Sequence, residues 1–195
     1  MSDSETIDFG YICFYFGYID NRYPEYLNFS DTFDSQITDD ILEIIKDKGC
    51  KHLHFGQNFN QNLDNLPDFI ESIILSDCKY FDQPLDNLPI NLNTLIVGDS
   101  CKRPLDFLPV GLKNLELPVG YNQPLDNLPS GLEYLKIDWC YDKPLNNLPE
   151  GLKILKIFTG LYKYDLLILP SSLEKLIISS SYKGKIKEGV IVEYY

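Results

Sequence analysis

The sequence predicts an α/β solenoid: short parallel strands stacked side by side, return segments that are mostly loop, and one helix near residues 38–48. The first observation is the dipeptide Leu-Pro, which recurs at spacings of 22, 20, 20, 20 and 21 residues. Its copies are Leu66-Pro67, Leu88-Pro89, Leu108-Pro109, Leu128-Pro129, Leu148-Pro149 and Leu169-Pro170. The second observation is that apolar residues follow each copy at fixed offsets. A fixed period of this length is typical of stacked repeat units, because one unit alone cannot bury its apolar face.

Each unit contains a short strand after its Leu-Pro corner. Apolar residues stand three and six residues after every proline, and another follows two residues later. The last two alternate with period two, as side chains on one face of a strand do. These pairs are Ile73 and Leu75, Leu95 and Val97, Leu115 and Leu117, Leu135 and Ile137, Leu155 and Ile157, and Leu176 and Ile178. Gly111, Gly131 and Gly151, two residues after proline, predict a turn with positive φ at that position.

The units upstream of residue 59 are less regular. Strand patterns at residues 27–29 and 53–55 flank isoleucines at helical spacing, which predict the helix over 38–48. Thr38 is the expected N-cap of that helix, and Gly49 is the expected C-terminal glycine. We therefore divide the chain into an aromatic N-terminal cap that forms a hairpin (1–26), a degraded repeat with the helix (27–58), regular repeats (59–181) and a C-terminal cap (182–195).

Composition limits the classes of partner. The chain has a formal net charge of -12 and an isoelectric point near 4.5, which repels nucleic acid and anionic membranes. The apolar run at residues 9–19 is too short to cross a bilayer and follows acidic residues, so we expect neither a membrane span nor a signal peptide. Five irregularly spaced cysteines favour reduced thiols and a cytoplasmic location. The sequence leaves the oligomeric state open.

A further motif opens most units, with an aromatic residue first and Asn or Asp next. It appears in Phe59-Asn60-Gln61-Asn62-Leu63, Phe81-Asp82-Gln83-Pro84-Leu85 and Tyr121-Asn122-Gln123-Pro124-Leu125. We expect the aromatic residues, together with Tyr141, Tyr162 and Tyr182, to form a buried column. With the Leu-Pro corner and the apolar residues that follow, these segments resemble the FNIP repeat, which reads roughly F-N-x-P-[IL]. The resemblance covers residues 59–186. It is broken by Cys101 and Lys102 at one opening, by Asn62 in place of proline, and by Tyr162 to Leu166, where the proline is absent.

The resemblance to the FNIP repeat implies an α/β leucine-rich-repeat-like solenoid that acts in protein–protein interaction. It also implies a source in social amoebae or in giant viruses of amoebae, and hence the host cytoplasm for a viral chain. Some family members join the repeats to an F-box, so a substrate receptor of a ubiquitin ligase is an alternative function, although the first 50 residues show no F-box. A glycan or small-ligand binder is a third alternative.

The outward side chains of the strands form the candidate site. They alternate with the buried residues and vary from unit to unit, as expected of a surface for a protein partner; β-branched residues also suit a half-exposed strand that binds nothing. Ser72 is expected to be exposed on this surface. The predicted partner-binding residues are His52, His54, Ile74, Ile96, Glu116, Tyr134, Lys136, Asp138, Ile154, Lys156 and Phe158.

Other chemistry has weaker support. The sequence contains no catalytic motif, so we predict no enzymatic activity, no cofactor and no metal site. His52 and His54 share a strand face, but the residues expected opposite them offer no carboxylate or thiolate. Trp139 follows a strand outside the aromatic column, where it has the potential to stack on a sugar. Acids recur once per corner, and hydrogen bonds to the turn backbone explain them better than calcium does; they are Asp64, Asp86, Asp106 and Asp126.

Overall fold

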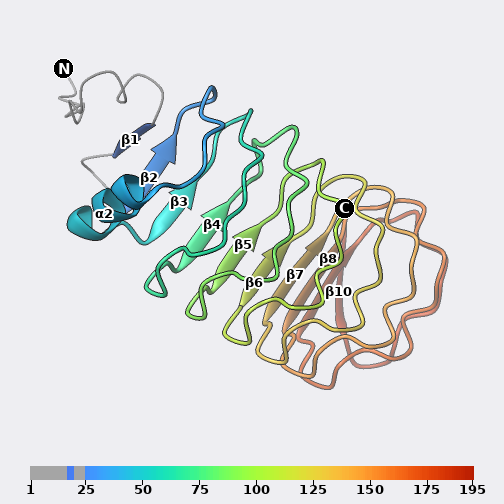
Figure 1. Cartoon of the computed structure of the whole chain (residues 1–195). Helices are drawn as coiled ribbons and strands as arrows, with labels where there is room; N and C mark the ends of the chain where they lie inside the picture. Colours follow the sequence, from blue (N-terminus) through green and yellow to red (C-terminus); the bar gives the residue numbers. More distant parts are fainter. Residues whose placement is uncertain (1–16, 20–24) are drawn as a thin grey trace, which may run out of the picture.

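The computed structural model describes residues 17–19 and 25–195, which wind around one sheet (Figure 1). Its strands lie in sequence order, so each unit of the repeat adds one strand beside the previous one. The elements are β1 (Gly17–Ile19), β2 (Tyr26–Phe29), α2 (Asp39–Lys48), β3 (His52–His54), β4 (Ser72–Ile74), β5 (Thr94–Ile96), β6 (Asn114–Glu116), β7 (Tyr134–Ile137), β8 (Ile154–Ile157), β9 (Lys175–Ile178) and β10 (Ile191–Tyr194).

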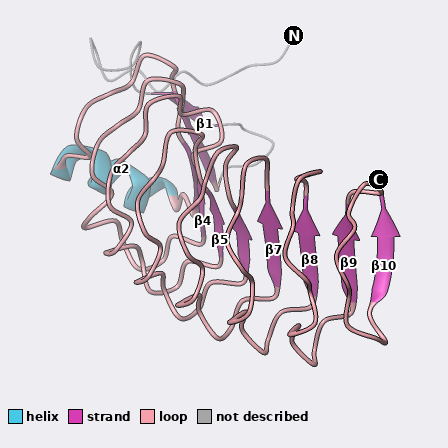
Figure 2. Ribbon diagram, turned by 90° about the vertical axis from the view of Figure 1, so that its right-hand side faces the viewer, coloured by secondary structure: helices cyan, strands magenta, loops and turns pink. Residues whose placement is uncertain are grey.

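Strands β2 to β10 are parallel, and equivalent residues of successive units pair with one another. Leu53 pairs with Ile73, and Ile73 pairs with Leu95, so each position of the repeat becomes a column through the molecule. These three side chains are fully buried. Figure 2 shows the strands along one side of the solenoid and the loops along the other. The predicted solenoid of short parallel strands and mostly loop returns is confirmed.

Helix α2 confirms the helix predicted over 38–48. Ile41 and Ile45 lie on its buried face, and the left-handed Gly49 (φ 65°) ends it. The Cys50 N–H donates to the Ile45 carbonyl (3.0 Å), which closes the C-terminus in the manner of a Schellman motif. Thr38 occupies the N-cap position with extended backbone, but its side chain makes no capping hydrogen bond. The capping role predicted for Thr38 is therefore wrong, although its place at the helix boundary is right.

The predicted buried column of aromatic residues is confirmed. It consists of Phe33, Phe59, Phe81, Cys101, Tyr121, Tyr141, Tyr162 and Tyr182. The ring of Phe59 stacks on Phe33 at 5.8 Å and on Phe81 at 6.1 Å between ring centroids. Cys101 is the one member of this column without a ring, and it separates the phenylalanines from the tyrosines.

The tyrosines of the column also bond to the preceding unit. The Tyr121 hydroxyl donates to the Arg103 carbonyl (3.2 Å), and the Tyr162 hydroxyl donates to the Lys143 carbonyl (3.2 Å). Both carbonyls belong to the residue before the motif proline. Tyr141 occupies the same column, but its buried hydroxyl has no hydrogen-bond partner among the described residues. Burial raises the pKa of all three phenols, so they remain neutral.

The Asn or Asp after the aromatic residue links one unit to the next. Its side-chain oxygen accepts a hydrogen bond from the backbone N–H of the equivalent residue one unit later. Asn60 accepts in this way from Asp82 (3.0 Å), and Asp82 accepts from Lys102 (3.2 Å). Lysine has no acceptor atom, so Lys102 interrupts the series. It resumes where Asn122 accepts from Asp142 (2.9 Å). This bond explains why most units carry a short side chain with an acceptor oxygen at this position.

The glycines two residues after proline do not have positive φ, so that prediction is wrong. They allow close approach of the preceding unit instead. A Cβ at Gly131 would lie 3.0 Å from the Val110 carbonyl oxygen, and one at Gly151 would lie 2.7 Å from the Ser130 carbonyl oxygen. Ser172, at the same position of a later unit, donates from its hydroxyl to the Leu152 carbonyl (2.8 Å). Glycine is therefore favoured at this position by the close approach of a carbonyl from the preceding unit, and not by a positive φ.

Two of the corner acids, Asp106 and Asp126, bond to the next unit rather than to their own turn, which corrects the prediction for them, whereas Asp64 accepts from the Asn62 amide within its own unit (2.7 Å). The Asn127 amide donates to Asp106 (3.0 Å), and the Asn147 amide donates to Asp126 (2.8 Å). Asn and Asp of neighbouring corners are thus complementary. The pattern accounts for both residue types without a bound cation.

The two ends of the sheet differ. At one end β1 pairs antiparallel with β2, so a strand covers the first parallel edge. The hairpin predicted for residues 1–26 lies largely outside the described residues, and the domain boundaries remain a prediction. At the other end β10 pairs parallel with β9, and its side chains are mostly exposed. The four described cysteines are free thiols, three of them buried: Cys50, Cys78, Cys101 and Cys140.

Candidate interaction surface

Each of β2 to β10 has two outward side chains, as Tyr134 and Lys136 are on β7. Together with the residue two positions further along the chain, such as Asp138, they form a continuous surface that we call the strand face. All eleven predicted partner-binding residues lie on it, and each is half-buried because neighbouring strands bring side chains against one another. Ser72 is buried between His52 and Thr94 of the adjacent strands, which corrects its predicted exposure. The structure brings the predicted residues into one sheet but divides them into two chemically different groups.

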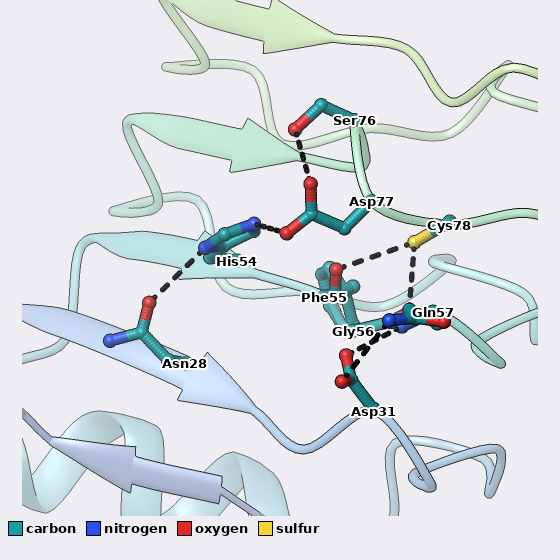
Figure 3. Close-up of polar contacts among 9 residues, drawn as sticks. All are labelled: Asn28, Asp31, His54, Phe55, Gly56, Gln57, Ser76, Asp77 and Cys78. Carbon is teal, nitrogen blue, oxygen red and sulfur yellow. Dashed lines mark hydrogen bonds and ion pairs between the residues drawn. The ribbon is translucent and has the colours of Figure 1, made fainter.

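The N-terminal half of the strand face, on β2 to β5, carries histidines, small polar residues and isoleucines. The His52 ring stacks on Tyr26 at 4.3 Å between ring centroids. His54 Nδ1 lies 3.2 Å from Asn28 Oδ1, and His54 Nε2 lies 3.1 Å from Asp77 Oδ2 (Figure 3). The second contact is an ion-pair distance without the alignment of a hydrogen bond. A carboxylate therefore does approach His54, contrary to the prediction.

Asp77 reaches His54 because the turn after β4 is held in place. The Cys78 thiol donates to the carbonyls of Phe55 (3.5 Å) and Gly56 (3.3 Å) in the neighbouring turn, as Figure 3 shows. Burial raises the pKa of that thiol to about 12, so it is a neutral donor. In residues 17–19 and 25–195, no three His, Cys, Asp or Glu side chains gather closely enough to hold a metal ion. The contacts with Asn28 and Asp77 hold the His54 ring from both of its nitrogens.

The C-terminal half of the strand face, on β6 to β10, is ionic and aromatic. Lys136 Nζ lies 3.1 Å from Glu116 and 3.8 Å from Asp138. Burial lowers the pKa of Lys136, but the hydrogen bond and charge of Glu116 outweigh burial and leave that pKa above its ordinary value. Burial and the neighbouring Glu116 carboxylate also raise the pKa of Tyr134. Lys136 is therefore protonated and Tyr134 is neutral at neutral pH.

Lys156 differs from Lys136 in its partner. Its ammonium lies over the Tyr134 ring, 5.2 Å from the centroid, in a cation–π contact. The ammonium of Lys136 lies 5.9 Å from the centroid of Phe158, whose ring in turn contacts Tyr195 at 4.9 Å. These contacts join the rings and lysines at β7 and β8 to Tyr195, which follows β10.

Charges alternate along the columns that flank the strand face, which the sequence analysis missed. At the start of the strands, Lys51 lies between Glu25 (3.6 Å) and Glu71 (3.3 Å). Further along, Glu133 lies between Lys113 (2.8 Å) and Lys153 (2.5 Å). Hydrogen bonds from both lysines lower the pKa of Glu133 to about 2. The signal that would have revealed this series is the change of charge sign from one unit to the next at the residue before each strand, which Asn93 interrupts.

Exposed apolar side chains border the same half of the strand face, at the turns that follow the strands. Trp139 is 57% exposed, and the backbone N–H of Gly120 donates to its carbonyl (2.8 Å), which joins this turn to that of Val119. Val119 is also exposed, and so is Leu161 in the turn after β8. Of these three, Trp139 alone was a candidate from the sequence. We call Val119, Trp139 and Leu161 the apolar rim.

Comparisons with known proteins agree with this architecture. The family model described as the FNIP repeat matches residues 44–78, 81–119 and 121–159, more than half of the chain. A solved structure titled "The crystal structure of CroV588 a novel circular LRR protein structure" has a TM-score of 0.66 with this chain and 23% sequence identity. The match covers 87% of this chain but 29% of that one, so this chain spans less than a third of its length. No curated protein matches.

The described residues contain no helix long and apolar enough to span a membrane. The repeat columns, the sheet register and the family model lead to one assignment. The leucine-rich-repeat-like solenoid generally serves as a scaffold for protein interaction. The chain belongs to the FNIP repeat family.

Proposed function

We propose that this chain is a protein-interaction module that binds a protein partner through the strand face, with the C-terminal half and the apolar rim as its anchor. The observation that carries the proposal is the grouping of half-buried Tyr134 and Phe158 with exposed Trp139, beside lysines and carboxylates. Aromatic residues surrounded by polar groups are typical of the energetic centre of an interface. From unit to unit the buried residues stay similar while the outward residues vary. This pattern suits a scaffold that binds a specific partner.

The size of the strand face supports a protein rather than a small molecule as its partner. Nine parallel strands at about 4.8 Å spacing give a surface roughly 40 Å long. A stable protein interface covers on the order of 800 Å² on each partner, which a surface of this length accommodates. The net charge of -12 disfavours nucleic acid as the partner.

A reducing cytoplasm, that of the host if the chain is viral, is the proposed location. The support is chemical: Cys50, Cys78 and Cys101 are buried free thiols, and burial raises the pKa of each. A buried neutral thiol is a poor nucleophile for disulfide exchange. These cysteines act as small core residues in the reduced state.

The test is affinity purification with quantitative mass spectrometry, using the whole chain as bait. Replacing Lys156 by Glu and Trp139 by Ser removes the cation–π contact and the most exposed ring of the anchor. We expect partner recovery to fall about tenfold or more, the size of a typical interface hot spot. Lys79→Glu is the matched control, because it makes the same charge change at an exposed lysine away from the strand face. Equal recovery by both variants would overturn the anchor, and recovery of a ubiquitin-ligase adaptor would favour the receptor alternative.

A further inference from the structure

Because the units repeat, the residue at each corner position can be compared with the equivalent residues of the other units. At the second position before proline, most units carry Asn, and Asn127 and Asn147 donate to the acid of the preceding corner. Phe107 stands at this position, where its side chain is 70% exposed. By the register of the repeat, Phe107 faces Asp86 as Asn127 faces Asp106, but a phenyl ring donates no hydrogen bond. This unit thus lacks a bond that the next two units make.

The position after proline departs in the same place. Val110 and Ile90 are 66% and 60% exposed there, whereas other units have Asp68, Ser130, Glu150 and Ser171 at this position. The two side chains lie on adjacent turns, because a Cβ at Gly111 would lie 3.2 Å from the Ile90 carbonyl oxygen. Val110 and Phe107 belong to one corner, three residues apart. The three side chains therefore gather at neighbouring corners, and we call Ile90, Phe107 and Val110 the corner patch.

Folding does not require the apolar side chains of the corner patch, because polar residues occupy the same positions in other units. Exposed side chains gain little from the hydrophobic effect within the chain, and the lost donor weakens the contact between units. Departures from an otherwise consistent local rule occur where function demands them. Contiguous exposed apolar side chains mark interaction sites.

We propose that the corner patch is a second docking surface, which binds a partner segment that carries aliphatic side chains flanked by lysine or arginine. The charge around it selects that chemistry. Asp86 and Asp106 are exposed on either side of Phe107, and Asp68 lies in the corner before Ile90. Lys113 is paired with Glu133, and Arg103 is paired with Asp82, so neither neutralises these acids.

The same charge argues against a second copy of the chain as occupant. Two corner patches face to face would bring Asp86 and Asp106 against their own counterparts, in molecules that each carry a net charge of -12. The corner patch precedes the strands, whereas the apolar rim follows them. A partner segment at the corner therefore leaves the strand face free, and one chain holds two partners.

The test measures binding of a fluorescent peptide about 12 residues long, built of alternating lysine and leucine, to the purified full chain. The variant I90S/F107N/V110S keeps every charge and restores residue types found in other corners. We expect its affinity to be about tenfold lower than that of the wild type. The control is Ile168→Asn, at the position equivalent to Phe107 in a later unit and 64% exposed, which we expect to bind as the wild type does. F107N alone is a milder second variant, with an intermediate loss.

Three results would overturn the proposal. Equal binding by the triple variant would show that the peptide responds to net charge alone. Equal binding of a glutamate–leucine peptide would show that the acids select nothing. Sedimentation that finds a wild-type dimer and a monomeric variant would identify a second copy as the occupant. Folding is monitored by thermal unfolding, and we expect F107N to unfold at the wild-type temperature or above, since it supplies the missing donor to Asp86.

Discussion

The two halves of this solenoid use the same backbone and different side-chain chemistry. In the N-terminal half, from β2 to β5, phenylalanine rings fill the interior column and the strand face carries no lysine or carboxylate. In the C-terminal half, from β6 to β10, tyrosines fill the column, and the strand face is built of ion pairs and cation–π contacts. Cys101, between β5 and β6, marks the change in the column.

This difference teaches that the repeat constrains shape at each position but not polarity. A ring fills the column in every unit except that of Cys101, and both phenylalanine and tyrosine serve in that place. Phe29 and Phe55 add further stacking in the N-terminal half, at 4.5 Å between their ring centroids. In the C-terminal half, hydroxyls reach the carbonyls of the preceding unit. One half is thus held by apolar stacking, and the other adds hydrogen bonds.

The largest expected effect is on the phenylalanine column. Phe59→Ala removes a fully buried ring that stacks on Phe33, Phe55 and Phe81, and we expect a loss of about 3–5 kcal/mol in the free energy of unfolding. Cys101→Ala in the same column removes one sulfur atom and is expected to cost on the order of 1 kcal/mol. Urea unfolding measures both. Equal losses at the two positions would contradict a column held by ring stacking.

A smaller effect is expected from the tyrosine hydroxyls. Tyr121→Phe removes a donor to the Arg103 carbonyl and is expected to cost about 1 kcal/mol. Tyr141→Phe is the matched control, because the Tyr141 hydroxyl is buried without a partner. Its removal is expected to be neutral or stabilising. If the two substitutions change the unfolding free energy equally, hydrogen bonding does not distinguish the C-terminal half.

Much of the fold was predictable because the columns recur. Leu135 and Ile137 repeat the pattern of Leu95 and Val97, and a pattern repeated six times specifies both the strand and its buried side. Helix α2 was predictable because isoleucine spacing and Gly49 agree on one element. These features depend on residues within a single unit. They are therefore visible in a linear sequence.

What the sequence did not predict depends on the offset between neighbouring units. Gly131 is needed because the Val110 carbonyl of the previous unit approaches it, and Asp106 meets Asn127 of the next unit. Asp77 reaches His54 through the turn geometry after β4. Each contact joins residues about twenty positions apart, at distances that only the stacked structure defines. The chemistry of the candidate surface belongs to this second class.

The smallest expected effect concerns the alternating charges at the strand starts. Hydrogen bonds from Lys113 and Lys153 lower the pKa of Glu133 from its ordinary value of 4.5 to about 2. A carboxyl with a lowered pKa in the folded state stabilises the fold above its unfolded pKa, and that stabilisation is lost as the pH falls. The relevant window therefore runs from about 4.5 down to about 2. Glu133→Gln removes the titrating group, so its stability should fall less steeply through this window than that of the wild type.

Glu71→Gln serves as the matched substitution in the N-terminal half, because Glu71 contacts one lysine, Lys51, where Glu133 contacts two. We expect Glu71→Gln to change the free energy of unfolding less than Glu133→Gln does. The measurement is denaturant unfolding across the acid range at low and high salt, since screening weakens exposed pairs. Taking the difference between each variant and the wild type removes the contribution of the other acids. Identical profiles for the two variants would show that the charge series stabilises both halves alike, and would confine their difference to the interior column and the strand face.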